Sequence, residues 1–214
     1  MPVASSRPLR ARSALEKIRR RDEILRAAER LWLSTSYADL SMNQIAREAR
    51  LAKGTLYLYF DTKEELFLAL LHEYLQTWFQ QFNDLLGARQ PRTTSEMTAT
   101  LIDALEGQDH LRRLLLLLST VLRSHLSPEV EADFRRDMHQ LLQQTVHRMP
   151  YTPDINRQIL IHCYALAVGW QQMAAALGQV PGPDAAICEK EKEGAFRLAL
   201  EAVIERLGQQ AQAS

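Results

Sequence analysis

Apolar residues recur every three or four positions along most of this 214-residue chain. In the first clear segment they stand at i, i+3, i+4, i+7 and i+8, as Ile24, Ala27, Ala28, Leu31 and Trp32. That spacing places them on one face of a helix. Because no segment shows the alternation of β-branched and polar residues that is typical of strands, the pattern predicts an all-α fold.

Helix boundaries are marked by capping residues, glycine and proline. In a capping box, a Ser or Thr side chain and a Glu or Gln three residues later each bind a free backbone N–H of the other's turn. The three expected boxes are Ser41–Gln44, Thr62–Glu65 and Thr93–Glu96. Proline-containing helix starts follow at 127–129 and 152–154, and the expected helix ends are Gly87, Gly107, the loop 179–183 and Gly208. These signals predict nine helices, of which the first runs from about residue 15 to residue 34.

Charge is unevenly distributed, although the formal net charge is zero. Residues 1–60 hold 12 Lys or Arg against 6 Asp or Glu, whereas residues 61–214 hold 14 against 20. A basic N-terminal part indicates a polyanion-binding end and a separate body. Residues 1–14 are expected to form a flexible basic arm, in which Arg7, Arg10 and Arg12 either contact a minor groove or stay in solvent.

Several classes of protein are disfavoured. Cys163 and Cys188 are the only two cysteines, which is too few for a disulfide framework, and they do not stand at metal-ligand spacings with histidine. The aliphatic run Leu114–Leu118 is too short to span a membrane, and the N-terminus lacks the apolar stretch of a signal peptide. No catalytic or nucleotide-binding motif is present. We therefore expect a cytoplasmic protein that is not an enzyme and has no cofactor or metal.

The segment 41–63, SMNQIAREARLAKGTLYLYFDTK, is predicted to form a short helix, a turn at 50–52, a second short helix and the start of a long helix. In a helix-turn-helix, the second helix enters the DNA major groove. Cationic and hydroxyl side chains suit phosphates and base edges, and a glycine lets the backbone come close. The candidate DNA contacts are Ser41, Asn43, Arg50, Lys53, Gly54, Thr55, Tyr57, Tyr59 and Lys63. The alternative is that the tyrosines are semi-buried aromatics of a three-helix core.

Three strings in this region, ILRAAERLW, SMNQIAREA and above all KGTLYLYFDTKEEL, resemble the N-terminal domain of the TetR family of transcriptional regulators. The resemblance covers about residues 18–78, and the remainder matches in its helical layout only. It implies a DNA-binding domain at 15–62 and an effector-binding and dimerisation domain at 63–214. It also implies a homodimeric repressor that leaves a palindromic double-stranded DNA operator when a small molecule binds.

The chain departs from the family pattern at the turn. Arg50 and Ala52 stand where members often have Gly and Ser, Ser36 replaces a usual Gly, and Leu58 replaces a His or aromatic residue. If the turn keeps a left-handed residue, Arg50 costs about 1–2 kcal/mol, which an added phosphate contact would offset. Ala52 removes a helix N-cap worth about 1 kcal/mol.

In the body, aromatic, histidine and apolar residues on the predicted helices are candidates for an effector pocket, with core packing or a dimer seam as the alternative for each. The pocket candidates are Trp78, Phe82, Leu118, Leu122, Arg123, His125, His139, His162, Tyr164, Trp170 and Gln171. Small residues among large ones on helices 154–178 and 184–207 suit a four-helix dimer interface. The alternative is a monomer in which these two helices form an internal hairpin. The interface candidates are Ile159, Cys163, Leu166, Trp170, Ala195, Leu198 and Ala202.

Two other interpretations remain open from the sequence. One is a DNA-binding protein of the same fold that does not respond to a ligand, which would lack a cavity in its body. The other is a redox-responsive regulator that acts through Cys163 or Cys188, although thiols on apolar helical faces are usually inert.

Overall fold

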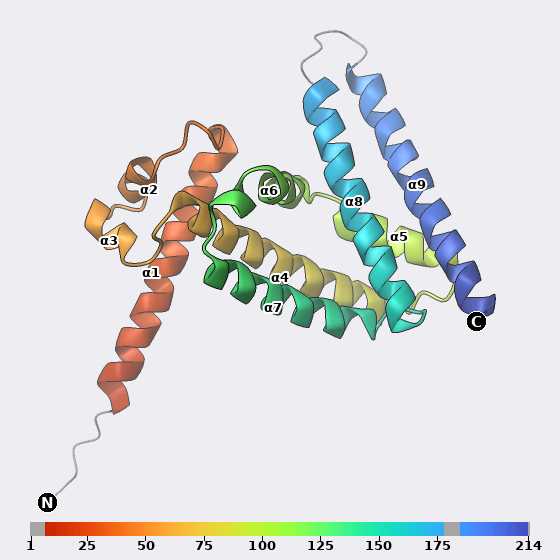
Figure 1. The fold of residues 1–214 in the computed structure, drawn as a ribbon, viewed down its shortest axis with the longest axis horizontal. Coiled ribbons are helices and arrows are strands. Elements are labelled where there is room, and N and C mark those ends of the chain that lie inside the picture. Colours follow the sequence, from red (N-terminus) through yellow and green to blue (C-terminus); the bar gives the residue numbers. More distant parts are fainter. Residues whose placement is uncertain (1–6, 178–184, 214) are drawn as a thin grey trace, which may run out of the picture. The chain divides into compact units, whose positions relative to one another are not determined.

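The computed structural model describes the backbone of residues 7–177 and 185–213 and the side chains of residues 14–173 and 194–209. The chain divides into two compact units, Met1–Leu70 and Leu71–Ser214. Across the described residues the elements are nine α-helices and one short 3-10 helix, with no strand (Figure 1). The prediction of an all-α fold is therefore confirmed.

The first unit consists of α1 (Arg7–Ser34), α2 (Met42–Glu48), α3 (Lys53–Tyr57) and the first turns of α4 (Lys63–Arg89). Its core includes Ile24, Ile45 and Leu56, all fully buried. The unit ends eight residues beyond the predicted boundary of 62, because Phe67 on α4 also packs in this core. Its ring contacts those of Trp32 and Tyr37 edge-on, at centroid distances of 6.0 and 5.0 Å.

Helix α1 begins at Arg7, so the prediction of a flexible arm over residues 1–14 is wrong for residues 7–14. That expectation followed from the basic character of the segment. Arg, Leu and Ala are nevertheless strong helix formers, and extending an existing helix is much easier than nucleating one. Residues 1–6 and the side chains of Arg7, Arg10 and Arg12 lie outside the described residues.

The capping predictions are largely confirmed. Both reciprocal hydrogen bonds are present at Ser41–Gln44 and at Thr93–Glu96. At the start of α4, the Glu65 N–H donates to Thr62 Oγ1 over 3.1 Å, while the Glu65 carboxylate accepts from Asp61 N–H rather than from Thr62 N–H.

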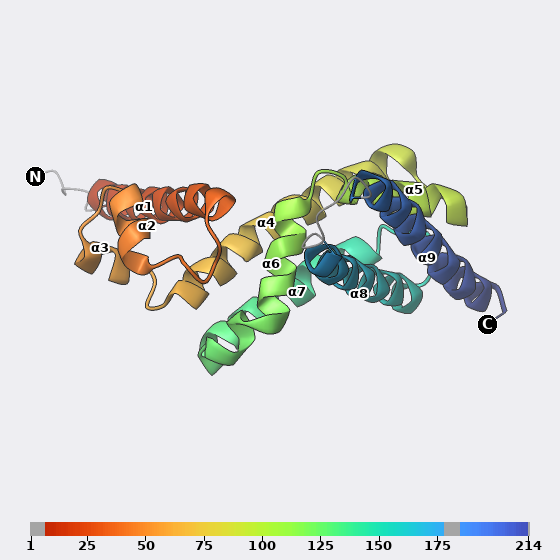
Figure 2. The ribbon, with the colours of Figure 1, turned by 90° about the horizontal axis from the view of Figure 1, so that it is seen from above.

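The second unit contains the rest of α4, five further α-helices and one short 3-10 helix. These are α5 (Thr94–Leu105), α6 (Asp109–Thr120), the 3-10 helix η1 (Leu122–His125), α7 (Pro128–Val146), α8 (Pro153–Leu177) and α9 (Ala185–Ala213). Helix α8 packs between α6 and α9 (Figure 2). Helices α4 and α7 meet where the His72 and Phe134 rings contact each other, at 6.2 Å between centroids. The predicted buried helix around Leu114–Leu118 is α6, but only Leu111 and Leu114 on it are buried.

Glycine marks helix ends less consistently than predicted. Gly107 has a φ of +68° and separates α5 from α6 as expected, whereas Gly87 lies inside α4. Gly208 does not end α9, which continues to Ala213. A Cβ on Gly208 would come within 3.2–3.3 Å of the Tyr151 side chain. Its small size therefore permits close packing. The predicted loop 179–183 lies outside the described residues.

Candidate nucleic-acid interface and cavity of the helical body

The turn between α2 and α3 keeps the expected left-handed residue. Arg50 has a φ of +56°, and the next N–H, that of Leu51, donates to Ala46 O over 2.8 Å. Ala52 occupies the N-cap of α3 and makes no side-chain cap hydrogen bond. Leu56 and Phe60 are buried beneath α3. The helix is thus held by its buried side chains rather than by its cap.

We expect Arg50→Gly to raise the free energy of unfolding by roughly 0.5–1 kcal/mol. Relief of about 1–2 kcal/mol of left-handed backbone strain exceeds the extra entropy that glycine gives the unfolded chain. Urea denaturation measures the change. The control Arg47→Gly, within α2, is expected to lower stability by about 0.5–1 kcal/mol. Equal destabilisation by both variants would contradict the interpretation of strain at Arg50.

The outer face of α3 presents the residue types that the DNA-binding hypothesis requires. Lys53, Gly54, Tyr57 and Leu58 are exposed, and Thr55 is half-buried. The Lys53 ammonium lies 5.8 Å from the centre of the Tyr57 ring. A Cβ added to Gly54 would meet no atom within 4 Å. The Lys53–Tyr57 pair, a cation beside a phenol, therefore lies next to an open backbone position at Gly54.

The remaining candidate contacts differ in how free their side chains are. Asn43 and Arg50 are exposed, and Tyr59 is half-buried. The Ser41 hydroxyl takes part in the capping box of α2, where it accepts from Gln44 N–H. Its exposed position still leaves the start of α2 accessible to a phosphate.

Lys63 is held by its own unit. Its Nζ donates to Tyr37 O and Leu40 O over 2.9 and 2.8 Å and lies 4.0 Å from the centre of the Tyr37 ring. Burial lowers the pKa of Lys63, and the neighbouring Glu64 carboxylate opposes this shift. Burial also raises the pKa of Tyr37, whose hydroxyl donates to Glu64 over 2.7 Å. Lys63 therefore ties the start of α4 to the loop before α2, and its phosphate contact stays a prediction.

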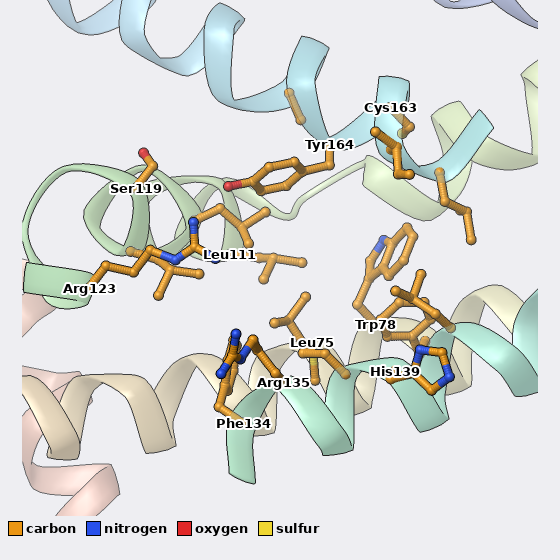
Figure 3. Close-up of a pocket in the computed structure, with 18 of the residues that line it drawn as sticks. Leu75, Trp78, Leu111, Ser119, Arg123, Phe134, Arg135, His139, Cys163 and Tyr164 are labelled. Atoms are coloured by element: carbon orange, nitrogen blue, oxygen red, sulfur yellow. The ribbon is translucent and has the colours of Figure 1, made fainter. Parts of the chain in front are cut away.

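The second unit contains a cavity of about 600 Å³, within the usual range for small-molecule sites. Helices α4, α6, α7 and α8 supply most of its walls (Figure 3). The lining consists of Leu75, Trp78, Phe79, Leu105, Leu111, Leu115, Leu118, Ser119, Arg123, Leu126, Glu131, Phe134, Arg135, Met138, His139, Leu142, Leu160, Ile161, Cys163, Tyr164 and Ala167. Most of these side chains are apolar.

Five of the predicted pocket residues line this cavity, namely Trp78, Leu118, Arg123, His139 and Tyr164. The other six do not. Phe82 and Leu122 are fully buried, with Phe82 stacked on Trp78 at 5.3 Å. His125 and His162 are exposed beside the backbone carbonyls of Val121 and Gln158, and Trp170 packs against Phe196 at 5.7 Å. Gln171 is half-buried outside the lining.

Apart from His139, the wall supplied by α7 was missed by sequence reasoning. Its residues Phe134, Arg135, Met138 and Leu142 line the cavity. They follow one another at intervals of one, three and four, so helical spacing could have found them. The polar residues between them concealed that stripe.

The predicted dimer-interface residues fall into two groups. Ile159 and Cys163 are buried within their own unit, at 0% and 4% exposure, so neither side chain is available to a partner. Leu198 is 69% exposed, Ala195 and Ala202 are exposed, and Leu166 and Trp170 are half-buried. Burial raises the pKa of the Cys163 thiol to about 12, which disfavours the reactive thiolate. The side chain of Cys188 lies outside the described residues.

Two features are absent from the described residues. No group of three or more His, Cys, Asp or Glu side chains among them could hold a metal ion. None of the helices there is long and apolar enough to cross a membrane.

Comparisons with known proteins agree with this geometry. Residues 24–70 match the family model of bacterial regulatory proteins, tetR family, and residues 72–177 match that of the tetracyclin repressor-like C-terminal domain. The chain is 47% identical over 51 residues to an uncharacterised HTH-type transcriptional regulator of Mycobacterium tuberculosis, covering 24% of this chain and 25% of that protein. It is 34% identical over 62 residues to the HTH-type transcriptional regulator QacR of Staphylococcus aureus, covering 29% and 33%. The matched segments thus span a quarter to a third of these relatives.

Solved structures share the fold over most of the chain. FadR of Thermus thermophilus, a TetR family transcriptional repressor in complex with lauroyl-CoA, has a TM-score of 0.58 at 19% identity and covers 87% of this chain and 92% of its own. A TetR transcriptional regulator from Rhodococcus has a TM-score of 0.54 at 18% identity, covering 88% and 97%. Since the two family models together account for nearly all of residues 24–177, this chain belongs to the TetR family of helix-turn-helix transcriptional regulators.

Proposed function

We propose that the protein is a homodimeric repressor that binds a palindromic operator through α3 and releases it when a small molecule occupies the cavity of the second unit. The observation that carries the proposal is the exposed surface of α3, where the Lys53–Tyr57 pair lies beside an open Gly54. Cationic and hydroxyl groups position a helix on phosphates, and a residue without a side chain lets the backbone approach the bases.

Effector control is supported by the cavity of about 600 Å³. An architectural protein of this fold would gain nothing from such a space, because cavities in a core cost stability. FadR, which shares the fold, is a repressor in complex with lauroyl-CoA. A ligand shifts a protein between two states only through its different affinity for them. The DNA-binding units of the two subunits must lie about 34 Å apart to reach successive major grooves. A ligand-bound state with a different spacing would therefore no longer fit the operator.

Dimerisation is supported by the outer faces of the last two helices. On α9, Ala195, Leu198 and Ala202 are exposed at positions three and four apart, which is one face of a helix. On α8, Met173 is 53% exposed and lies outside the cavity lining. Small residues beside large ones allow helices to approach closely, and burial of these faces against a second copy would remove apolar surface from water.

The proposal is tested by titrating the protein into a fluorescent duplex taken from upstream of its own gene, at several salt concentrations. We expect two chains per site, a linear fall of log affinity with log salt, and much weaker binding to an unrelated duplex. Leu198→Glu is expected to yield monomers in sedimentation velocity and to weaken operator binding by about a hundredfold, because the two DNA-binding units then bind separately.

Gln209→Glu, another exposed position of α9, is the matched control and should behave as the unaltered protein does. Equal affinity for the upstream and unrelated duplexes would exclude a specific regulator. A Leu198→Glu variant that stays dimeric would place the interface elsewhere.

A further inference from the structure

The cavity of the second unit has two chemically different sides. One side is apolar and aromatic. There Trp78 stacks on Phe82 and contacts Phe79 edge-on. The Trp78 indole N–H donates to Ala104 O over 2.8 Å, so the polar atom of this side chain already has a partner. What Trp78 offers a ligand is therefore its ring.

The other side is cationic. Figure 3 shows the guanidinium groups of Arg123, on η1, and Arg135, on α7, on the side of the cavity away from Trp78 and Cys163. The Tyr164 hydroxyl points toward the same side. Ser119 also lies there, although its hydroxyl already donates to Leu116 O over 2.8 Å.

These cations are only weakly neutralised by the protein itself. Within the part of the chain that the structure describes, Arg135 forms no ion pair or hydrogen bond, and neither does the Tyr164 hydroxyl. Arg123 approaches a single carboxylate, that of Glu131, at 3.9 Å. That separation is too long for a hydrogen bond. Two guanidinium groups thus face the cavity against one carboxylate.

Guanidinium groups bind carboxylates through paired, charge-assisted hydrogen bonds. A cationic ligand would be repelled by the same two groups. A neutral apolar ligand would fill the aromatic side but would leave Arg135, which is exposed, with water as its only acceptor. The histidine of the lining, His139, is exposed and lies on the side away from the arginines, so it does not compete for the same headgroup.

We propose that the effector is an amphiphile with one carboxylate headgroup, which Arg123 and Arg135 bind, and an apolar body that packs on Trp78 and the leucines of the cavity. The inference rests on the proposed effector control and specifies its ligand class. A long-chain carboxylate satisfies both sides of the cavity at once, whereas the corresponding alcohol satisfies only the apolar side.

The test uses chain-matched probes on the full-length protein. Calorimetric titrations compare decanoate, decan-1-ol and decyltrimethylammonium, and decanoyl-coenzyme A distinguishes a free carboxylate from a thioester with a bulky anionic head. We expect decanoate to bind at least about tenfold more tightly than decan-1-ol, as charge-assisted hydrogen bonds predict. Arg135→Gln should weaken decanoate binding about tenfold while leaving decan-1-ol within about twofold.

The matched control is Arg136→Gln. Arg136 is the next residue of α7, is 73% exposed and pairs with Asp133 at 3.0 Å outside the cavity lining. It should leave the binding of every probe unchanged. A preference for decanoate that disappears in Arg135→Gln and persists in Arg136→Gln supports the inference.

Any one of four outcomes overturns the inference. Decanoate and decan-1-ol bind equally, or the decyltrimethylammonium cation binds more tightly than decanoate. Alternatively, the coenzyme A thioester binds more tightly than the acid, or no probe binds. The proposed function is judged separately, by adding each bound probe to the operator complex. If decan-1-ol binds and releases the DNA, effector control stands and only the headgroup assignment fails. If probes bind and none releases the DNA, effector control fails.

Discussion

Gly54→Glu is expected to weaken operator binding by at least about a hundredfold while leaving the protein folded and slightly more stable. A Cβ at this position meets no atom within 4 Å, and glutamate is a better helix former than glycine by about 0.5–1 kcal/mol. The carboxylate also lies in the first turn of α3, where the helix dipole favours negative charge. Against DNA, the same group meets phosphates of like charge, at a cost of several kcal/mol.

Misfolding would lower both the stability and the DNA binding of the variant. This prediction instead combines slightly higher stability with weaker DNA binding. Urea denaturation measures stability, and fluorescence anisotropy with the operator duplex measures binding. Gly54→Gln removes the charge and retains the bulk, so it should bind more tightly than Gly54→Glu and more weakly than the unaltered protein.

Gly87 offers a matched control, since it is also helical with no atom within 4 Å of an added Cβ. Gly87→Glu changes the net charge equally and should bind the operator as the unaltered protein does. Undiminished operator binding by Gly54→Glu would mean that α3 does not approach DNA at this residue.

Local chemistry explains why much of the first unit could be predicted from the sequence. Ser41 and Gln44 are three residues apart and satisfy each other's backbone, so the start of α2 depends on no distant contact. The left-handed conformation of Arg50 follows from the chain having to turn between two short helices whose apolar residues are buried together.

The failures concern positions where packing overrides local preference. Gly208 resembles a helix terminator, yet its role depends on Tyr151, which is distant in sequence and whose ring comes within 3.3 Å of an added Cβ. Ile159 and Cys163 resemble interface residues, but both are buried within their own unit. Sequence periodicity identifies an apolar face without stating which neighbour covers it.

Lys63 illustrates the same limit for the candidate DNA contacts. Its position at the start of α4 suggested a phosphate ligand, and only the fold brings the carbonyls of Tyr37 and Leu40 within 2.9 Å of its Nζ. The exposed residues of α3, whose surroundings are set by a five-residue helix, depend far less on such distant partners.

Asn156→Leu is expected to lower the free energy of unfolding by about 3 kcal/mol. Asn156 is fully buried, and its Nδ2 donates to Val146 O, Met149 O and Tyr151 O over 2.8, 3.2 and 2.7 Å. Its Oδ1 accepts from Tyr151 N–H at 3.2 Å. Leucine has a similar size but makes none of these bonds, and each buried carbonyl left without a partner costs about 1–3 kcal/mol unless water reaches it.

This one amide holds the turn between α7 and α8, the two helices that supply facing walls of the cavity. Loss of the network should therefore weaken ligand binding together with stability, while operator binding at low temperature persists because α3 belongs to the other unit. Gln140→Leu, at an exposed position of α7, should change stability by less than about 0.5 kcal/mol. If Asn156→Leu unfolds in urea at the same midpoint as Gln140→Leu, the turn is held by packing alone, and the four hydrogen bonds contribute little beyond those that water would supply.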